Sequence, residues 1–212
     1  TADEMDMTAT GCTFSTYAYN VYSAIDTTYI TTIGELNPSE VSFGFGVSGR
    51  VRERMPSVIS TNTTISGSYW LDADIKVLDG ATLTIEQGTD ILVAPWDSSN
   101  LGTDISKCEI IVDGGLVING VSGNNVVIKS GHPSPSTGDW SGILINPGNI
   151  SVDIYNLVLE HADIGIETWR NVAIETTDIS SCGTGIYIVN SGGIYRNIIT
   201  RNCLNKGFYI VG

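Results

Sequence analysis

The chain of 212 residues is long enough for one elongated domain with an arm or a small second domain. Its formal net charge of −13 argues against nucleic acid and anionic membranes as partners. The sequence has no apolar run of about 18 residues, so it predicts no membrane span. The composition suits solubility outside a cell, and the chain starts at Thr1 rather than Met. We therefore expect a secreted or cell-surface protein whose leader has been removed.

Residues 1–57 form the first predicted unit, a β-rich arm or small cap. Large residues alternate with smaller ones in a strand pattern at Tyr17, Tyr19 and Val21. Three arginines recur at alternate positions and would share one face of a strand: Arg50, Arg52 and Arg54. This basic face would either contact an acidic surface, such as the body of a neighbouring copy, or form a solvated edge that blocks unwanted strand pairing.

Residues 58–212 form the second predicted unit, in which short strands alternate with glycine turns. In 75–93, apolar and polar residues alternate between turns at Gly80 and Gly88. A similar unit returns at 110–130. Short alternating strands that repeat along a chain predict a solenoid of strands.

The second half of this unit repeats with a period of 20 to 22 residues. Ile179 follows Leu159 at a distance of 20. Gly185 follows Gly165 at the same distance, and Gly207 follows after 22 more. This period predicts an all-β, right-handed parallel β-helix of about six or seven rungs. A β-sandwich, the alternative all-β fold, requires no fixed period.

The step of 20 also predicts which side chains share a column of the stack. Ile199 lies 20 residues after Ile179, so we expect these two residues to be stacked. The same step predicts a mildly polar column of Glu160, Ser180 and Thr200. Such a column lacks the second carboxyl group that glycoside hydrolysis requires.

Two stretches carry a family resemblance. Residues 75–93 resemble the first rungs of secreted right-handed parallel β-helix proteins of the pectin-lyase-like fold, which often read V-x-x-G-x-T-L-T-I-x-x-G-T-x-I. A later signature of that group, G-D-W-x-G-I, is matched at 138–143. The resemblance covers about 60–212 and implies the same fold, in a non-catalytic surface or fibre type. It implies little about activity, because this architecture carries lyases, hydrolases, adhesins and inert fibres.

No catalytic residues are predicted, so we do not expect an enzyme. The polygalacturonase-like hydrolases of this fold carry the signatures N-T-D, D-D, G-H-G and R-I-K. The sequence lacks all of these except for a partial match to G-H-G at 131–133. The densest group of carboxylates predicts an exposed hydrophilic strand face: Glu160, Asp163, Glu167, Glu175 and Asp178.

Few residues are candidates for covalent modification or metal binding. Cys182 and Cys203 fall on neighbouring rungs about 4.8 Å apart, within disulfide reach. Their offset of 21 rather than 20 would turn them to different faces, and a buried cysteine stack is the alternative. N-glycosylation sequons begin at Asn62 and Asn149. Calcium is the one cofactor with candidate ligands, which lack regular spacing: Asp97, Asp104 and Asp113.

The last residues of the sequence lead to the functional hypothesis. The chain stops within an apolar strand at Phe208, Tyr209 and Ile210, without a polar cap. An open β-helix end exposes unpaired strand edges and a slice of core. We expect the N-terminal arm of another copy to cover it, so that the chain assembles head to tail into an extracellular filament.

Two alternatives stay open. One is a polysaccharide-binding or polysaccharide-cleaving β-helix of the lyase or tail-spike type, with surface polysaccharide as its partner. A shallow groove would then carry the site, with three candidates for sugar stacking: Trp96, Trp140 and Trp169. The other alternative is the stalk of a larger adhesin.

Overall fold

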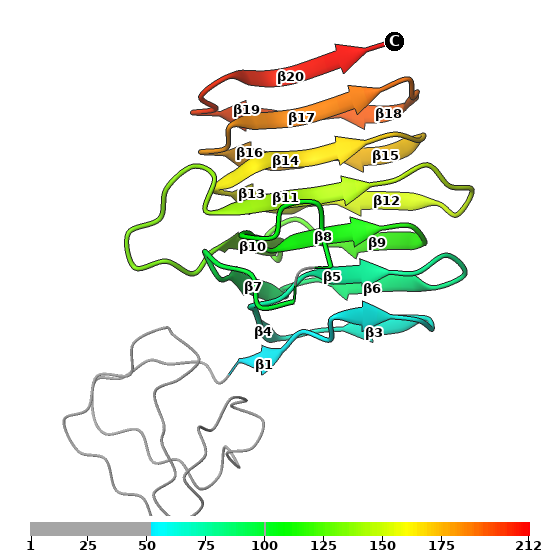
Figure 1. Cartoon of the computed structure of the whole chain (residues 1–212). Helices are drawn as coiled ribbons and strands as arrows, with labels where there is room; N and C mark the ends of the chain where they lie inside the picture. The colour runs from blue at the N-terminus through cyan, green and yellow to red at the C-terminus, as the bar shows by residue number, and fades with distance from the viewer. Residues whose placement is uncertain (1–51, 100) are drawn as a thin grey trace, which may run out of the picture. The chain divides into compact units, whose positions relative to one another are not determined.

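The computed structural model describes residues 52–99 and 101–212 (Figure 1). All the regular secondary structure in these ranges is β-strand. The chain divides into two compact units, Thr1–Arg54 and Met55–Gly212. In the first unit, Arg54 belongs to the exposed strand β1 (Glu53–Arg54) and Arg52 precedes it. The other predicted residues of this unit lie outside the described residues: Tyr17, Tyr19, Val21 and Arg50.

The second unit is a coil whose strands stack into three parallel sheets, here called sheets I, II and III. Within this unit, sheet I has the order β4 (Ser68–Leu71), β7 (Asp90–Val93), β10 (Val126–Ser130), β13 (Leu157–Glu160), β16 (Asp178–Ser180) and β19 (Ile199–Arg201). Sheet II has the order β2 (Val58–Ile59), β5 (Ile75–Val77), β8 (Glu109–Val112), β11 (Trp140–Ile145), β14 (Ala162–Thr168), β17 (Thr184–Val189) and β20 (Lys206–Val211). Sheet III has the order β3 (Thr63–Ile65), β6 (Thr82–Glu86), β9 (Gly115–Asn119), β12 (Val152–Tyr155), β15 (Val172–Glu175) and β18 (Gly193–Arg196).

Each turn of the coil contributes one strand to each sheet, in the order II, III, I (Figure 1). Neighbouring strands within a sheet are therefore separated by two other strands in the sequence, and all of them run parallel. Parallel strands of one sheet are joined by right-handed crossovers almost without exception. The predicted right-handed parallel β-helix is confirmed.

Buried isoleucines stack along the inside of sheet II, and their β-branched side chains suit a pleated, half-buried surface. One inward column begins at Ile75 and continues through Ile110, Ile143, Ile166 and Ile186. All of these residues are at most 1% exposed. Each fully buried side chain of this size contributes about 1.5–3 kcal/mol relative to an exposed one. The stack of identical side chains therefore stabilises the coil and fixes its register.

The predicted step of 20 holds for two neighbouring rungs and fails at the last one. Glu160 pairs with Ser180, and Ile166 with Ile186, as predicted. Ser180, however, pairs with Arg201 rather than with Thr200. The predicted column of Glu160, Ser180 and Thr200 is therefore wrong.

The predicted stacking of Ile199 on Ile179 is also wrong, because Ile199 pairs with Asp178. The last turn of the coil carries one extra residue before β18 and another before β20. Val172 consequently pairs with Gly193 at a step of 21, and the step between β17 and β20 is 22.

Single residues with positive φ turn the chain between the sheets. In the early rungs these are glycines, as predicted for Gly80 (φ 87°) and Gly88 (φ 74°). In the later rungs, non-glycine residues take over in two columns. One contains Asn156, Thr176 and Asn197, and the other contains His161, Ser181 and Asn202. The left-handed region is several-fold enriched in Asn, so Asn replaces Gly where the rung bends sharply.

Candidate functional site

The last coil of the β-helix, here called the open rung, consists of β18, β19 and β20 (Figure 1). Phe208 pairs with Ile186 and Ile210 pairs with Ile188, so both residues continue buried columns of sheet II. They are nevertheless 42% and 67% exposed. Among the described residues, β20 pairs only with β17, which leaves its other edge free. The open rung is thus a slice of core with unpaired strand edges.

The predicted assembly residues divide between two faces of β20. Phe208 and Ile210 point inward, whereas Tyr209 points outward and stacks on Tyr187 with ring centroids 5.0 Å apart. The Nζ of Lys206 lies 3.4 Å from the centroid of the Tyr209 ring. Such a cation–π contact is worth about 0.5–1 kcal/mol at an exposed site. The outer aromatic pair therefore supports the position of β20 on the stack.

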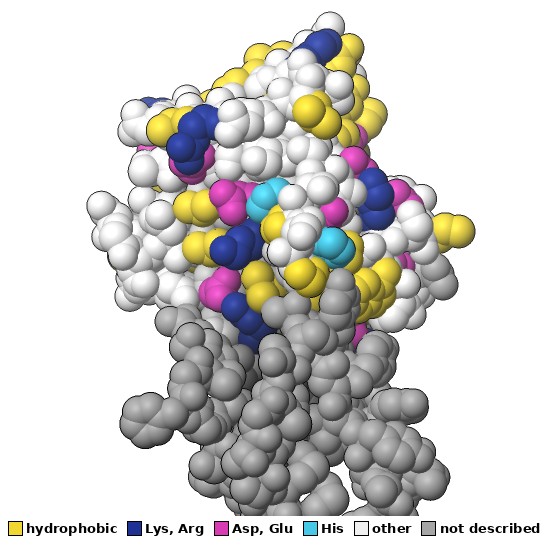
Figure 2. Space-filling view, turned by 90° about the vertical axis from the view of Figure 1, so that its left-hand side faces the viewer, with side chains coloured by type: hydrophobic (Ala, Val, Ile, Leu, Met, Phe, Trp, Pro, Cys, Tyr) yellow, Lys and Arg dark blue, Asp and Glu magenta, His cyan; other side chains and the backbone are white. Residues whose placement is uncertain are grey.

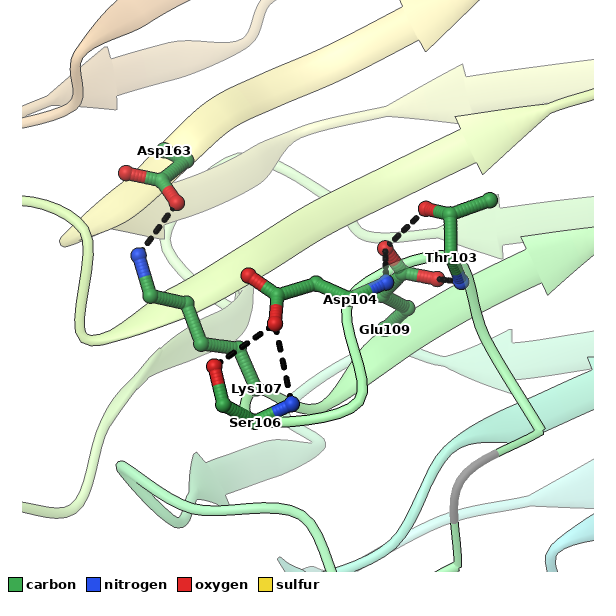
Figure 3. Close-up of polar contacts among 6 residues, drawn as sticks. All are labelled: Thr103, Asp104, Ser106, Lys107, Glu109 and Asp163. Carbon is green, nitrogen blue, oxygen red and sulfur yellow. Dashed lines mark hydrogen bonds and ion pairs between the residues drawn. The ribbon is translucent and has the colours of Figure 1, made fainter.

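A second candidate site is a shallow groove of about 220 Å³ on the outer face of sheet II, here called the sheet II groove. Strands β11 and β14 form its floor. Its polar lining comes from Thr103, Asp104, Glu109, Ser141, Asp163 and Glu167. The loop that follows β7 folds over this face and supplies one wall (Figure 3).

Two buried carboxylates attach that loop to the β-helix. Asp74 accepts hydrogen bonds from the backbone N–H groups of Leu101 and Gly102, at 2.9 and 2.6 Å. Glu109 accepts bonds from the N–H and the hydroxyl of Thr103, at 2.7 and 2.6 Å. Burial raises the pKa of the Asp74 carboxyl, although N–H donors oppose this shift. These carboxylates satisfy loop amides and are not free to react.

Each charged group of the sheet II groove already has a partner. Lys107 forms an ion pair with Asp163, and Ser106 donates to Asp104 from its N–H at 2.9 Å (Figure 3). Hydrogen bonds from Ser106 lower the pKa of Asp104. Glu167 accepts a bond of 2.7 Å from the indole N–H of Trp169, which is 41% exposed. Carboxylates thus line the groove, and two of them bond to one cation, Lys107, and to one exposed aromatic ring, Trp169.

The predicted hydrophilic strand face is wrong, because the five carboxylates lie on three sheets. Glu160 and Asp178 belong to sheet I, Glu175 ends a strand of sheet III, and Asp163 and Glu167 belong to sheet II. Only the last two approach the sheet II groove. The sequence did not indicate Lys107 or Glu109, because the path of the loop between β7 and β8 has no periodic pattern.

The three candidate calcium ligands are not brought together. Asp97 accepts bonds from the backbone of Asp74 and Ser99, and Asp104 accepts from Ser106. The third, Asp113, lies 3.4 Å from the Nζ of Lys76. Over 52–99 and 101–212, no group of three or more His, Cys, Asp or Glu residues is arranged to hold a metal ion.

Cys182 and Cys203 have free thiols. They occupy equivalent positions on neighbouring rungs rather than different faces. The register of β16 and β19 is 21, which equals the spacing of the two cysteines. Both thiols bond equivalent carbonyls two residues earlier, at 3.3 and 3.6 Å. Burial raises the pKa of Cys182 to about 12. The two cysteines therefore stack as predicted, but only Cys182 is buried, and Cys203 is half-buried.

The predicted glycosylation and sugar-stacking residues differ in accessibility. Asn62 and Asn149 are both exposed, although the side chain of Asn62 accepts a bond of 3.0 Å from the N–H of Thr82. Trp140 is fully buried and donates to the carbonyl of Glu160 at 2.9 Å, so it is structural. Trp96 packs against Trp70 with ring centroids 6.3 Å apart. Of the three predicted tryptophans, Trp169 is the one beside the sheet II groove.

Comparison with known proteins places this architecture in a family. The sequence model of the pectate-lyase-like β-helix domain matches residues 57–165, just over half of the chain. The chain belongs to this family. No curated protein and no solved structure matches it.

The matched part of this β-helix domain contains the lining of the sheet II groove except for Glu167, and the open rung lies beyond it. Membership in the family confirms the resemblance inferred from 75–93 and 138–143. It does not assign catalysis, since β-helices of one architecture carry many activities. In the described ranges, no helix has the length and apolar character to cross a bilayer.

Proposed function

We propose that the protein is a secreted, non-catalytic structural β-helix that assembles head to tail into an extracellular filament. The open rung carries this proposal, because Phe208 and Ile210 continue buried columns of sheet II and are 42% and 67% exposed. Contiguous exposed apolar surface marks an interaction site. In the filament, the N-terminal arm of the next copy covers this surface.

The chemistry of the open rung suits β-strand addition. An incoming strand pairs with the free edge of β20 through backbone hydrogen bonds and places apolar side chains over Phe208 and Ile210. Because the two contacting surfaces differ, such contacts repeat without closing and generate a fibre. Arg52 and Arg54 lie near the end of the arm and belong to the same proposed interface.

Sedimentation velocity of the full chain tests this proposal. Ile210→Asp places a charge on the inward face of β20 and is expected to reduce assembly at least about tenfold, since an unpaired buried charge opposes association. Ile105→Asp is the matched control, because Ile105 is 71% exposed on the loop that follows β7. Equal assembly of the two variants would exclude the open rung as the interface.

The sheet II groove supports a second candidate function, the binding of a glycan. Trp169 offers an exposed ring beside Glu167, and Tyr187 follows Glu167 in the next rung. The carboxylates outnumber the single cation Lys107, so the groove favours a neutral or amine-bearing glycan over an acidic one. Trp169→Ala is expected to abolish retention on neutral or amine-bearing polysaccharide gels. Unchanged retention, or no retention of the native chain, would argue against this candidate.

A further inference from the structure

We propose that electrostatic attraction directs the assembly, so that the open rung of one copy selects the acidic segment 1–50 of a second copy. This inference rests on the proposed function and specifies which segment docks and what guides it. The distribution of charged residues along the chain supports this inference, and it is a separate observation from the exposed apolar surface of the open rung.

The charge of the chain is strongly asymmetric. After Asp178 the sequence contains no acidic residue, and its only charged side chains are Arg196, Arg201 and Lys206. All three lie in the open rung, on β18, β19 and β20. Segment 1–50 contains one basic residue, Arg50, and six acidic ones: Asp3, Glu4, Asp6, Asp26, Glu35 and Glu40. A cationic surface and an anionic segment therefore belong to the same chain.

The cations remain available to a partner, although each has a neighbour. The side chain of Arg196 is 66% exposed and lies 3.9 Å from Glu175. That of Arg201 is 59% exposed and pairs with Asp178. Exposed ion pairs of this kind are weak, and a guanidinium has five donors, so each arginine can bind a second carboxylate. In Figure 2, dark blue cations and yellow apolar side chains lie together at the top of the described body.

This charge pattern selects one mode of pairing over another. Two open rungs that meet face to face would place three cations against three cations, and such like-charge contacts are costly. Docking of segment 1–50 on the open rung instead pairs cations with carboxylates around an apolar centre. The electrostatic term therefore favours head-to-tail growth over closed tail-to-tail dimers.

Complementary charge variants of the full chain test the inference by sedimentation velocity at low salt. The tail variant carries Arg196→Gln and Lys206→Glu, and the head variant carries Asp3→Lys, Glu4→Lys and Asp6→Lys. Each alone is expected to stay monomeric, and their equimolar mixture is expected to form dimers, because one intact head meets one intact tail. The head variant leaves every described residue unchanged, so its result does not depend on the folding of the open rung.

Salt and a matched control complete the experiment. Raising salt from about 0.01 M to about 1 M shortens the Debye length from about 30 Å to about 3 Å and is expected to weaken native assembly at least tenfold. Lys129→Glu, a charge reversal on β10 away from the open rung, is expected to assemble like the native chain. Assembly that neither variants nor salt affect would overturn this inference and leave the proposed function standing. Native chains that never assemble would overturn both.

Discussion

Thr176 is the least favourable residue in the column of left-handed turns that also contains Asn156 and Asn197. A β-branched side chain at φ 53° is strained, whereas Asn tolerates this region. We expect Thr176→Asn to stabilise the chain by about 1 kcal/mol, measured by chemical denaturation. Asn197→Thr, at φ 52° in the next rung, is the mirror control and is expected to destabilise it. The same sign for both changes would contradict this explanation of the turns.

Arg170 is a buried cation that binds backbone rather than a carboxylate. It is 6% exposed and donates to the carbonyls of Val112, Gly114 and Ile150, at 3.2, 2.5 and 3.1 Å. These carbonyls belong to the two preceding turns of the coil, so Arg170 ties three rungs together. Burial lowers its pKa.

We expect Arg170→Met to reduce the free energy of unfolding by about 3 kcal/mol, because three carbonyls lose their donor. Arg196→Met, at an exposed arginine, is expected to change it by less than about 0.5 kcal/mol. Thermal and denaturant unfolding measure both. Similar values for the two variants would show that the carbonyl contacts of Arg170 add nothing to stability.

The thiols provide a test of burial. Burial raises the pKa of Cys108 and Cys182, and only the thiolate form reacts with alkylating reagents. In a Cys12→Ser background at about pH 8, we expect iodoacetamide to modify Cys203 in the folded chain and all three cysteines after unfolding. Mass spectrometry identifies the modified residues. Rapid modification of Cys182 in the folded chain would contradict its place in the stack.

At the scale of elements, the loop between β7 and β8 depends on close packing at Gly102. A Cβ at this position would lie 2.2 Å from the carboxylate oxygen of Glu109 and 3.0 Å from that of Asp74. We expect Gly102→Ala to displace the loop, cost about 1–3 kcal/mol and accelerate amide exchange at 101–104. Gly192→Ala, where the nearest atom is 3.4 Å away, is the matched control. Unchanged exchange in Gly102→Ala would show that the buried carboxylates do not hold the loop.

The strands, the parallel stacking and the register of β12, β13 and β14 with β15, β16 and β17 could be predicted from the sequence, because alternation and a period of 20 are local, repeated patterns. The last step failed for a physical reason. Two turns gained one residue each, and a turn can lengthen without disturbing the buried columns on either side. Arg201 therefore takes the position predicted for Thr200, and Thr200 pairs with Ile179 instead.

The sheet II groove could not be predicted for a different reason. The loop that contributes Asp104 and Lys107 has no periodicity, and its path is determined by hydrogen bonds to Asp74 and Glu109. Polar residues in a loop do not reveal which distant carboxylate accepts their N–H groups. Phe208 and Ile210, in contrast, continue regular columns, so their inward direction followed from the repeat.

At the scale of the molecule, the β-helix is a stack whose buried columns reach an exposed surface. Ile166 and Ile186 are fully buried, and the next member of their column, Phe208, is 42% exposed. Each added strand would bury such a residue and satisfy one edge of hydrogen bonds. The proposed filament follows from repeating this step between copies.

Negative-stain electron microscopy of the native, full-length product tests the proposed assembly most directly. At about 4.8 Å per rung, the strands of sheet II rise about 30 Å, so we predict unbranched filaments with an axial repeat of at least that length. Filaments should be absent from the Ile210→Asp variant. Monodisperse single particles of the native product, or a native polypeptide whose own further rungs cover β20, would contradict the proposal.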